Sequence, residues 1–180
     1  MVVVDDIGSF PLPKGTTKAE FDTLYPRARE AIILGNTAAS EDYKILKRVV
    51  LESFEAKLNS GLDVATYPQH YDMHKQFLEP VEAFQTEPYL IDEKKAVLPE
   101  VEIISAAGKE LSEKAGKPIA LRVCVTGPIE LYLRTDFGTN IYKDILENLA
   151  RSVNSFLKNS VVKTPFVKTV SLSIDEPSIG

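Results

Sequence analysis

The sequence lacks the features of several broad classes of protein. It has one cysteine, Cys124, among 180 residues, so no disulfide can form within the chain, which is typical of the reducing cytoplasm. It has no apolar run near the roughly 18 residues of a membrane span, and Asp5 and Asp6 interrupt the N-terminus where a signal peptide needs an apolar stretch. Its net charge of −5 argues against nucleic acid, because phosphate binding requires a basic surface. We therefore expect a soluble cytoplasmic protein that binds neither membranes nor nucleic acid.

Common catalytic and cofactor motifs are missing as well. No G-x-G-x-x-G follows the first apolar run and there is no Walker-type loop, which removes the usual reasons to expect a nucleotide site. There is no nucleophile elbow and no triad pattern. His70 and His74 could share a helical face, but a zinc site needs three or four ligands, and Cys124 falls in another element. We interpret the histidines as surface or loop residues and Cys124 as a small buried group, and we predict no metal site on this chain.

Short apolar runs alternate with helical patterns along the whole chain. Strands are predicted within residues 2–7, 62–66, 88–97 (weakly), 119–125 and 170–175. Helices are predicted within residues 17–35, 40–61, 72–83, 99–116 and 140–156. This order is typical of βα units around a parallel sheet, in one domain covering residues 1–180. The pattern alone does not decide between an open doubly wound sheet and a closed barrel.

Local signals set the expected helix boundaries. Thr17 and Glu20 have the spacing of a capping box, and Pro26 predicts a break in the helix that follows. Ser40 is a good N-cap for a helix in which apolar residues recur every four positions, at Leu46, Val50, Phe54 and Leu58. Asn140 is predicted to cap the last helix, whose inward residues would be Ile141, Ile145, Leu149, Val153 and Phe156.

Four predicted strands end in polar or turn-forming residues, namely Gly8-Ser9, Tyr67 to Gln69, Thr126-Gly127-Pro128 and Asp175-Glu176. In a βα fold these ends meet on the face where ligands bind, although polar turns are common there in any case. Asp175 is the best single candidate. We expect helices to cover the face of Val170, Leu172 and Ile174, with Asp175 on the opposite, polar face and Glu176 turned away. The alternative is that one of the two acids caps a following helix.

Three of these segments resemble, in order and spacing, motifs of cobalamin-independent methionine synthase. They are Asp6-Ile7-Gly8-Ser9-Phe10-Pro11, Thr126-Gly127-Pro128-Ile129 and Ile174-Asp175-Glu176-Pro177-Ser178. The likeness is greatest to the short archaeal forms, described as methylcobalamin:homocysteine methyltransferases. The resemblance implies a (β/α)8 TIM barrel and transfer of a methyl group to the zinc-bound thiolate of homocysteine, which forms methionine. The methyl donor it implies is methylcobalamin, a corrinoid protein or a methylated pterin.

The resemblance also implies site residues. Ile7 and Ser9 match residues whose backbone holds the homocysteine carboxylate, and Asp175 matches the carboxylate that binds its amino group. Gln69 falls where the family has a glutamate, so one charged contact to the amino group becomes neutral. Arg134 stands about where folate-dependent members have a tryptophan that holds the methyl donor.

The family's zinc ligands, a His-x-Cys pair, a glutamate and a final cysteine, follow the Asp-Glu-Pro motif and are not in these 180 residues. Because a whole barrel takes about 250 residues, we expect an incomplete TIM barrel of about six βα units. Such a piece would be inactive alone, would bind no zinc, and would have open edges that favour self-association or a partner chain. The alternatives are a non-catalytic or regulatory relative that pairs with a separately encoded partner, and a related corrinoid-linked methyltransferase or decarboxylase on the same barrel. The Ile-Gly-Ser-Phe-Pro motif weighs against the latter but leaves a different thiol acceptor open.

Overall fold

The computed structural model describes residues 3–6, 10–139 and 141–179. Its helices are α1 (Lys18–Ile33), α2 (Glu41–Leu58), α3 (Lys75–Ala83), α4 (Pro99–Ala106), α5 (Gly108–Ala115), α6 (Pro128–Arg134) and α7 (Ile145–Asn159), with short 3-10 turns at Thr37–Ala39 and Glu93–Lys95. Its strands are β1 (Ala65–Thr66), β2 (Gln85–Glu87), β3 (Leu90–Ile91), β4 (Ile119–Thr126) and β5 (Val167–Asp175). No helix in the described ranges is both long enough and apolar enough to cross a membrane.

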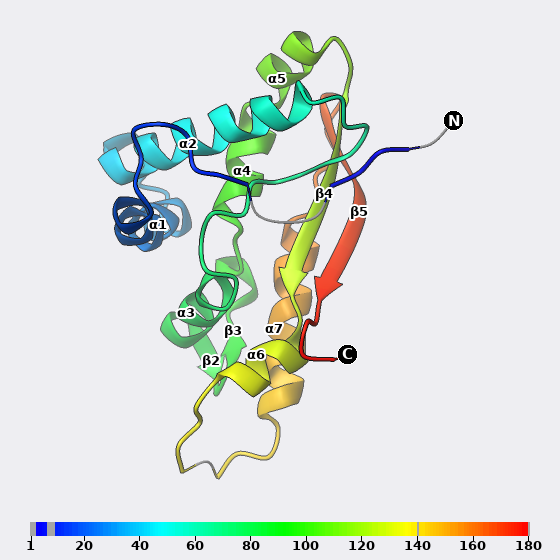
Figure 1. Cartoon of the computed structure of the whole chain (residues 1–180). Helices are drawn as coiled ribbons and strands as arrows, with labels where there is room; N and C mark the ends of the chain where they lie inside the picture. Colours follow the sequence, from blue (N-terminus) through cyan, green and yellow to red (C-terminus); the bar gives the residue numbers. More distant parts are fainter. Residues whose placement is uncertain (1–2, 7–9, 140, 180) are drawn as a thin grey trace.

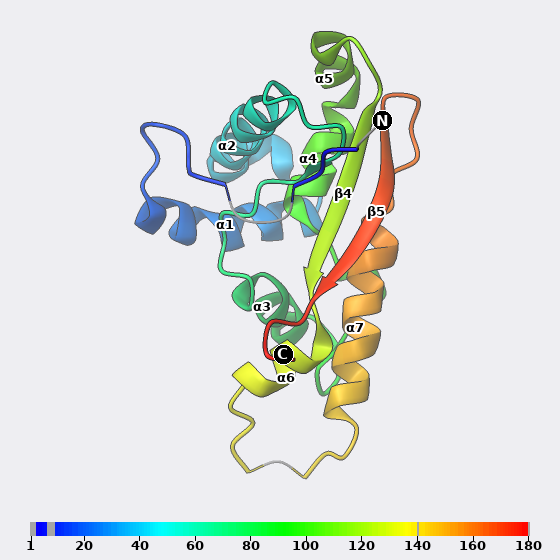
Figure 2. The same ribbon diagram turned by 45° about the vertical axis from the view of Figure 1, so that its right-hand side comes forward.

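The central sheet is parallel and has the strand order β1-β4-β5. A single parallel bridge between Asp5 and Val64 ties the N-terminal segment alongside β1. Strands β4 and β5 run side by side, and α6, α3 and the C-terminal segment lie at the end to which they point (Figure 1). The same end carries these elements when the molecule is turned (Figure 2). The carboxyl ends of the parallel strands therefore face a region built by α3, α6 and the chain terminus.

The prediction of an incomplete TIM barrel of about six βα units is wrong. The fold is α/β, but within the described residues only three strands form the parallel sheet, and β2 and β3 pair separately as an antiparallel hairpin. The physical reason lies in the connections. The predicted weak strand within 88–97 turns back on β2 through Tyr89, which has a φ of 60°. The segments between sheet strands also contain pairs of helices, α4 with α5 and α6 with α7, and no described residue between the members of a pair forms a strand.

Helix α1 begins as predicted and ends differently. Thr17 and Glu20 form the expected capping box, but the helix continues through Pro26 without a break, so that prediction is wrong. A mid-helix proline costs about 3 kcal/mol. This cost is offset by the burial of side chains before and after Pro26, since α1 packs against the rest of the molecule through Phe21, Leu24, Tyr25 and Ala28.

The other helices follow the predicted pattern with shifted ends. Ser40 caps α2 by accepting a hydrogen bond from the Tyr43 N–H, which confirms that prediction. The stretch predicted as one helix within 99–116 is divided into α4 and α5 at Ala107. Helix α7 begins at Ile145, so Ile141 lies outside it and is 81% exposed, while Asn140 lies outside the described residues. The inward face of α7 is as predicted, with Ile145, Leu149, Val153 and Phe156 buried.

Strand β5 has an apolar face that the helices leave half exposed. Val170, Leu172 and Ile174 are 51%, 47% and 53% exposed, so the prediction that helices cover this face is wrong. Leu172 and Ile174 are in register with Val123 and Val125 of β4, which are buried. The apolar face is continuous across the two strands, but the helical layer covers β4 and ends there, because β5 is the edge strand of the sheet.

Candidate functional site

A pocket of about 290 Å³ lies at the carboxyl ends of the parallel strands. It is lined by Gln69, Tyr71, Met73, Gln76, Cys124, Thr126 and Asp175. Two of the four predicted site residues, Gln69 and Asp175, are thus brought together from distant parts of the sequence. The other two, Ile7 and Ser9, lie outside the described residues.

The register of the sheet places Asp175 in this pocket. Thr126 pairs with Asp175 and Cys124 pairs with Ser173 along the β4–β5 ladder. Paired residues in a sheet direct their side chains to the same face, so Cys124, Thr126 and Asp175 form one wall. The ladder closes with a hydrogen bond of 2.8 Å from the Gly127 N–H to the Asp175 carbonyl. Cys124 is 8% exposed, which confirms the prediction that it is buried.

Glu176, the neighbour of Asp175, serves a different element. Its carboxylate accepts hydrogen bonds from the N–H groups of Ile129 (3.1 Å) and Glu130 (2.6 Å) in the first turn of α6. Gly127 leaves room for it, since a Cβ there would lie 2.1 Å from the Glu176 carboxyl carbon. One acid of the pair therefore does cap a helix, as the alternative foresaw, but the helix is the preceding α6 rather than a following one.

Most donors around the pocket are already used inside the protein. Gln69 Nε2 donates to Tyr67 Oη (3.2 Å), and Tyr67 Oη donates to the Cys124 carbonyl oxygen (2.5 Å). Thr126 Oγ1 donates to the Met73 carbonyl oxygen (2.8 Å). The lining therefore presents chiefly acceptors, including the Asp175 carboxylate. Such a pocket favours a ligand that donates hydrogen bonds, above all one with positive charge.

A buried polar network lies behind the pocket. Glu100 is 1% exposed, accepts hydrogen bonds from Tyr25 Oη (3.1 Å) and Gln76 Nε2 (3.3 Å to each oxygen), and lies on α4. Burial raises the pKa of the Glu100 carboxyl to about 7, although these hydrogen bonds and the charge of Arg29 act in the opposite direction. Nothing in the sequence pattern marks Glu100 as buried, because an acid in the first turn of a helix is usually exposed and stabilised by the helix dipole.

The network reaches a second wall residue through Glu79. Arg29 Nη2 pairs with Glu79 (2.8 Å), and Tyr71 Oη donates to both Glu79 oxygens (2.9 and 3.0 Å). The Tyr71 ring stacks on the Tyr25 ring with centroids 4.2 Å apart. The side chains of Tyr71 and Gln76 are thus both held in place by hydrogen bonds to buried groups on α1, α3 and α4.

The two histidines have structural partners. His70 lies in a loop, as predicted, but is buried rather than on the surface; its Nε2 lies 2.9 Å from Ser53 Oγ and its Nδ1 2.7 Å from the Phe10 carbonyl oxygen. Burial lowers the pKa of His70 to about 4. His74 Nε2 lies 2.9 Å from the buried carboxylate of Glu130.

Among the described residues no three His, Cys, Asp or Glu side chains are placed to hold a metal ion. The described residues therefore do not fit the zinc that the resemblance implies.

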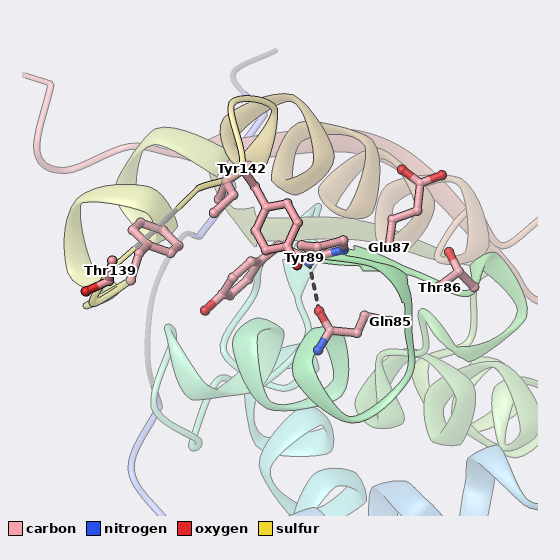
Figure 3. Close-up of a pocket in the computed structure, with 9 residues that line it drawn as sticks. Gln85, Thr86, Glu87, Tyr89, Thr139 and Tyr142 are labelled. Carbon is pink, nitrogen blue, oxygen red and sulfur yellow. Dashed lines mark hydrogen bonds between the residues drawn. The ribbon is translucent and has the colours of Figure 1, made fainter.

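A second pocket of about 460 Å³ lies between the β2–β3 hairpin and the segment before α7. In Figure 3 the rings of Tyr89 and Tyr142 lie at its centre, with Thr139 on one side and Thr86 and Glu87 on the other. Gln85 Oε1 accepts a hydrogen bond from the Tyr89 N–H (2.9 Å), which holds the hairpin turn. Neither Gln69 nor Asp175 lines this pocket, and among the described residues its lining contains one acidic side chain and no basic one.

Comparison with known proteins does not assign the chain to a family. The sequence matches no family model, and neither the curated proteins nor the solved structures compared with it gave a match.

Proposed function

We propose that this chain binds a small amino acid in the Asp175 pocket, with homocysteine as the first candidate, and forms the amino-acid-binding half of a homocysteine methyltransferase. The observation that carries the proposal is the presence of Gln69 and Asp175 in one pocket at the carboxyl ends of the strands. The three motifs that resemble cobalamin-independent methionine synthase support the same choice of ligand.

The chemistry of the pocket suits the ammonium end of an amino acid. An ammonium group has three donors, and the Asp175 carboxylate supplies a charged acceptor that forms short, strong hydrogen bonds. Gln69 Oε1 supplies a second, neutral acceptor, because the Gln69 Nε2 is bound to Tyr67. A volume of about 290 Å³ is at the lower end of the range for ligand pockets, which favours a small molecule.

The whole reaction would move a methyl group from methylcobalamin, a corrinoid protein or a methylated pterin to the homocysteine thiol. The described residues are assigned the binding and orientation of the amino acid, and none is assigned a catalytic role. We place this activity in the cytoplasm, where a single unpaired cysteine stays reduced.

Replacement of Asp175 by asparagine tests the binding site. We expect Asp175→Asn to weaken homocysteine binding between about 10-fold and 100-fold, because a hydrogen bond to a charged group is worth about 1.5–3 kcal/mol. Isothermal titration calorimetry with reduced L-homocysteine would measure this change. Asp144→Asn is the matched control, because it makes the same chemical change outside this pocket. Equal affinities for the two variants, or no binding to the unaltered chain, would refute the proposal.

A second candidate function is that of a non-catalytic subunit, and the exposed face of β5 favours it. The first part of the outer edge of β5 is paired within the chain, because the Thr169 N–H donates a 2.9 Å hydrogen bond to the Val162 carbonyl oxygen. From Val170 onward no described residue pairs with this edge. Exposed strand edges with apolar side chains favour pairing with another chain. We take a second copy as the partner. Antiparallel pairing centred on Leu172 would place the apolar faces of the two copies side by side, with the two Leu172 side chains opposite each other.

Replacement of Leu172 by lysine tests this surface. We expect the unaltered chain to form dimers at micromolar concentration and Leu172→Lys to shift it toward monomer by at least 10-fold in dissociation constant, because two lysines would meet near the symmetry axis. Leu133→Lys is the control, since Leu133 is an exposed leucine on α6, away from β5. Light scattering across a dilution series measures the masses. A monomeric unaltered chain, or an equal effect of the two variants, contradicts this pairing.

A further inference from the structure

Gln76 lines the Asp175 pocket, and the nitrogen of its side-chain amide is bound by groups buried behind the pocket. Its Nε2 lies 2.9 Å from Tyr25 Oη and 3.3 Å from each oxygen of Glu100. A carboxamide nitrogen has two N–H groups, and both have acceptors in this buried network. The group that Gln76 can offer to the pocket is therefore its carbonyl oxygen, which adds one more acceptor to the Asp175 wall.

We propose that Glu100 is a positioning residue that sets, through Gln76, whether this wall of the pocket accepts or donates hydrogen bonds. As a carboxylate, Glu100 accepts from Gln76 Nε2 and from Tyr25 Oη, and the Gln76 carbonyl faces the pocket. Protonated by solvent, Glu100 carries an O–H that needs an acceptor. Rotation of the Gln76 amide by half a turn supplies its carbonyl to that O–H and turns the N–H groups toward the pocket.

The surroundings of Glu100 make its protonation sensitive to pH near neutrality. The titratable and charged groups that act on it are Tyr25 and Arg29 from α1. The pKa of Tyr67 is raised chiefly by burial and further by the charge of Glu100. Helix α2 also packs on α4, but Lys57, its buried charged residue, is paired with Asp6. The charged side chains of α5 are exposed. Burial exceeds the opposing effects, and the pKa of Glu100 is raised to about 7.

The effect of Glu100 protonation on ligand binding rests on the proposed function, the binding of an amino acid in this pocket. A ligand ammonium group can donate a hydrogen bond to the Gln76 carbonyl oxygen. It loses this hydrogen bond when the Gln76 N–H groups face the pocket instead. A hydrogen bond is worth about 1 kcal/mol, so protonation of Glu100 should weaken binding about fivefold. The ammonium and carboxylate groups of homocysteine keep their charges between pH 5.5 and about pH 8, so the ligand contributes little to this change.

Nuclear magnetic resonance of the Gln76 side-chain amide tests the inference without any ligand. We expect its proton and nitrogen resonances to shift between pH 5.5 and pH 8 with a midpoint near neutrality, and to stay constant in Glu100→Gln, which cannot titrate. Glu113→Gln, an exposed glutamate on α5, is the matched control and should behave as the unaltered chain does. Resonances that do not move, or that move equally in Glu100→Gln, would overturn the inference.

Calorimetric titration with L-homocysteine at pH 5.5 and pH 8 tests the effect on binding. About fivefold weaker binding at pH 5.5 in the unaltered chain, and equal binding at both pH values in Glu100→Gln, supports the inference. Binding that is independent of pH in the unaltered chain contradicts it. If homocysteine fails to bind at any pH while the Gln76 resonances still titrate, the proposed function fails and the role of Glu100 stands.

Discussion

Replacement of Asp6 by alanine is expected to lower the free energy of unfolding by up to about 3–5 kcal/mol, the cost of leaving a buried charge without its partner; the Asp6 side chain itself is 26% exposed. Lys57 is 2% exposed, and its Nζ lies 2.6 Å from Asp6 Oδ2. The other Asp6 oxygen accepts the Thr66 N–H at 2.8 Å, so the same carboxylate also fixes the N-terminal segment beside β1. Without Asp6, the Lys57 ammonium stays buried with one neutral acceptor, the Thr66 carbonyl (3.1 Å).

Urea unfolding of three variants separates this effect from a general loss of charge. Asp22→Ala removes an acid from an exposed pair with Lys18 and should cost less than about 1 kcal/mol. The double variant Asp6→Ala/Lys57→Met removes both charges and should recover much of the loss, because an apolar side chain of similar size can occupy the site. A loss for Asp6→Ala as small as that for Asp22→Ala would show that the Lys57 ammonium does not depend on this pair.

Replacement of Glu100 by glutamine is expected to remove a pH dependence of stability of roughly 3 kcal/mol. The folded carboxyl has a pKa of about 7 and the unfolded one a pKa near 4.5, so between these values the folded state holds the proton more strongly. The contribution of Glu100 to stability is therefore greatest below pH 4.5 and is lost as pH rises through 7. At pH 8 the unaltered chain buries a charge that Glu100→Gln does not have.

Urea unfolding at a series of pH values measures this directly. The stability of Glu100→Gln relative to the unaltered chain should rise by roughly 3 kcal/mol between pH 4.5 and pH 8. The difference between the two proteins isolates this group, because all others titrate in both. Glu113→Gln, with a side chain 66% exposed, should show no such trend. A constant difference across the range would mean that Glu100 is not kept protonated by burial.

Local signals in the sequence determined the parts of the fold that depend on neighbouring residues. The capping box at Thr17 and Glu20, the N-cap at Ser40 and the inward periodicity of α7 are all present in the structure. These features rest on contacts within three or four residues, which a sequence pattern records directly. The predicted strand at 119–125 is also present, as β4, because a run that is apolar on both faces is typical of a central parallel strand.

Part of the candidate site could be predicted from the sequence. Asp175 and Gln69 line one pocket, as expected if their strands are parallel, but Ile7 and Ser9 lie outside the described residues. The buried Glu100 network and the burial of His70 were not predicted. Each depends on residues far apart in the chain, such as Tyr25 with Glu100 and Phe10 with His70.

The sequence by itself determined an α/β chain of capped helices and parallel strands, with an acid at the end of the last strand. The tertiary structure decided that the strands form a three-stranded sheet rather than a barrel, that Pro26 lies inside a helix, and that the apolar face of β5 stays half exposed. The reason is that the number of paired strands and the extent of the helical layer follow from long-range packing. Local patterns do not encode where that packing ends.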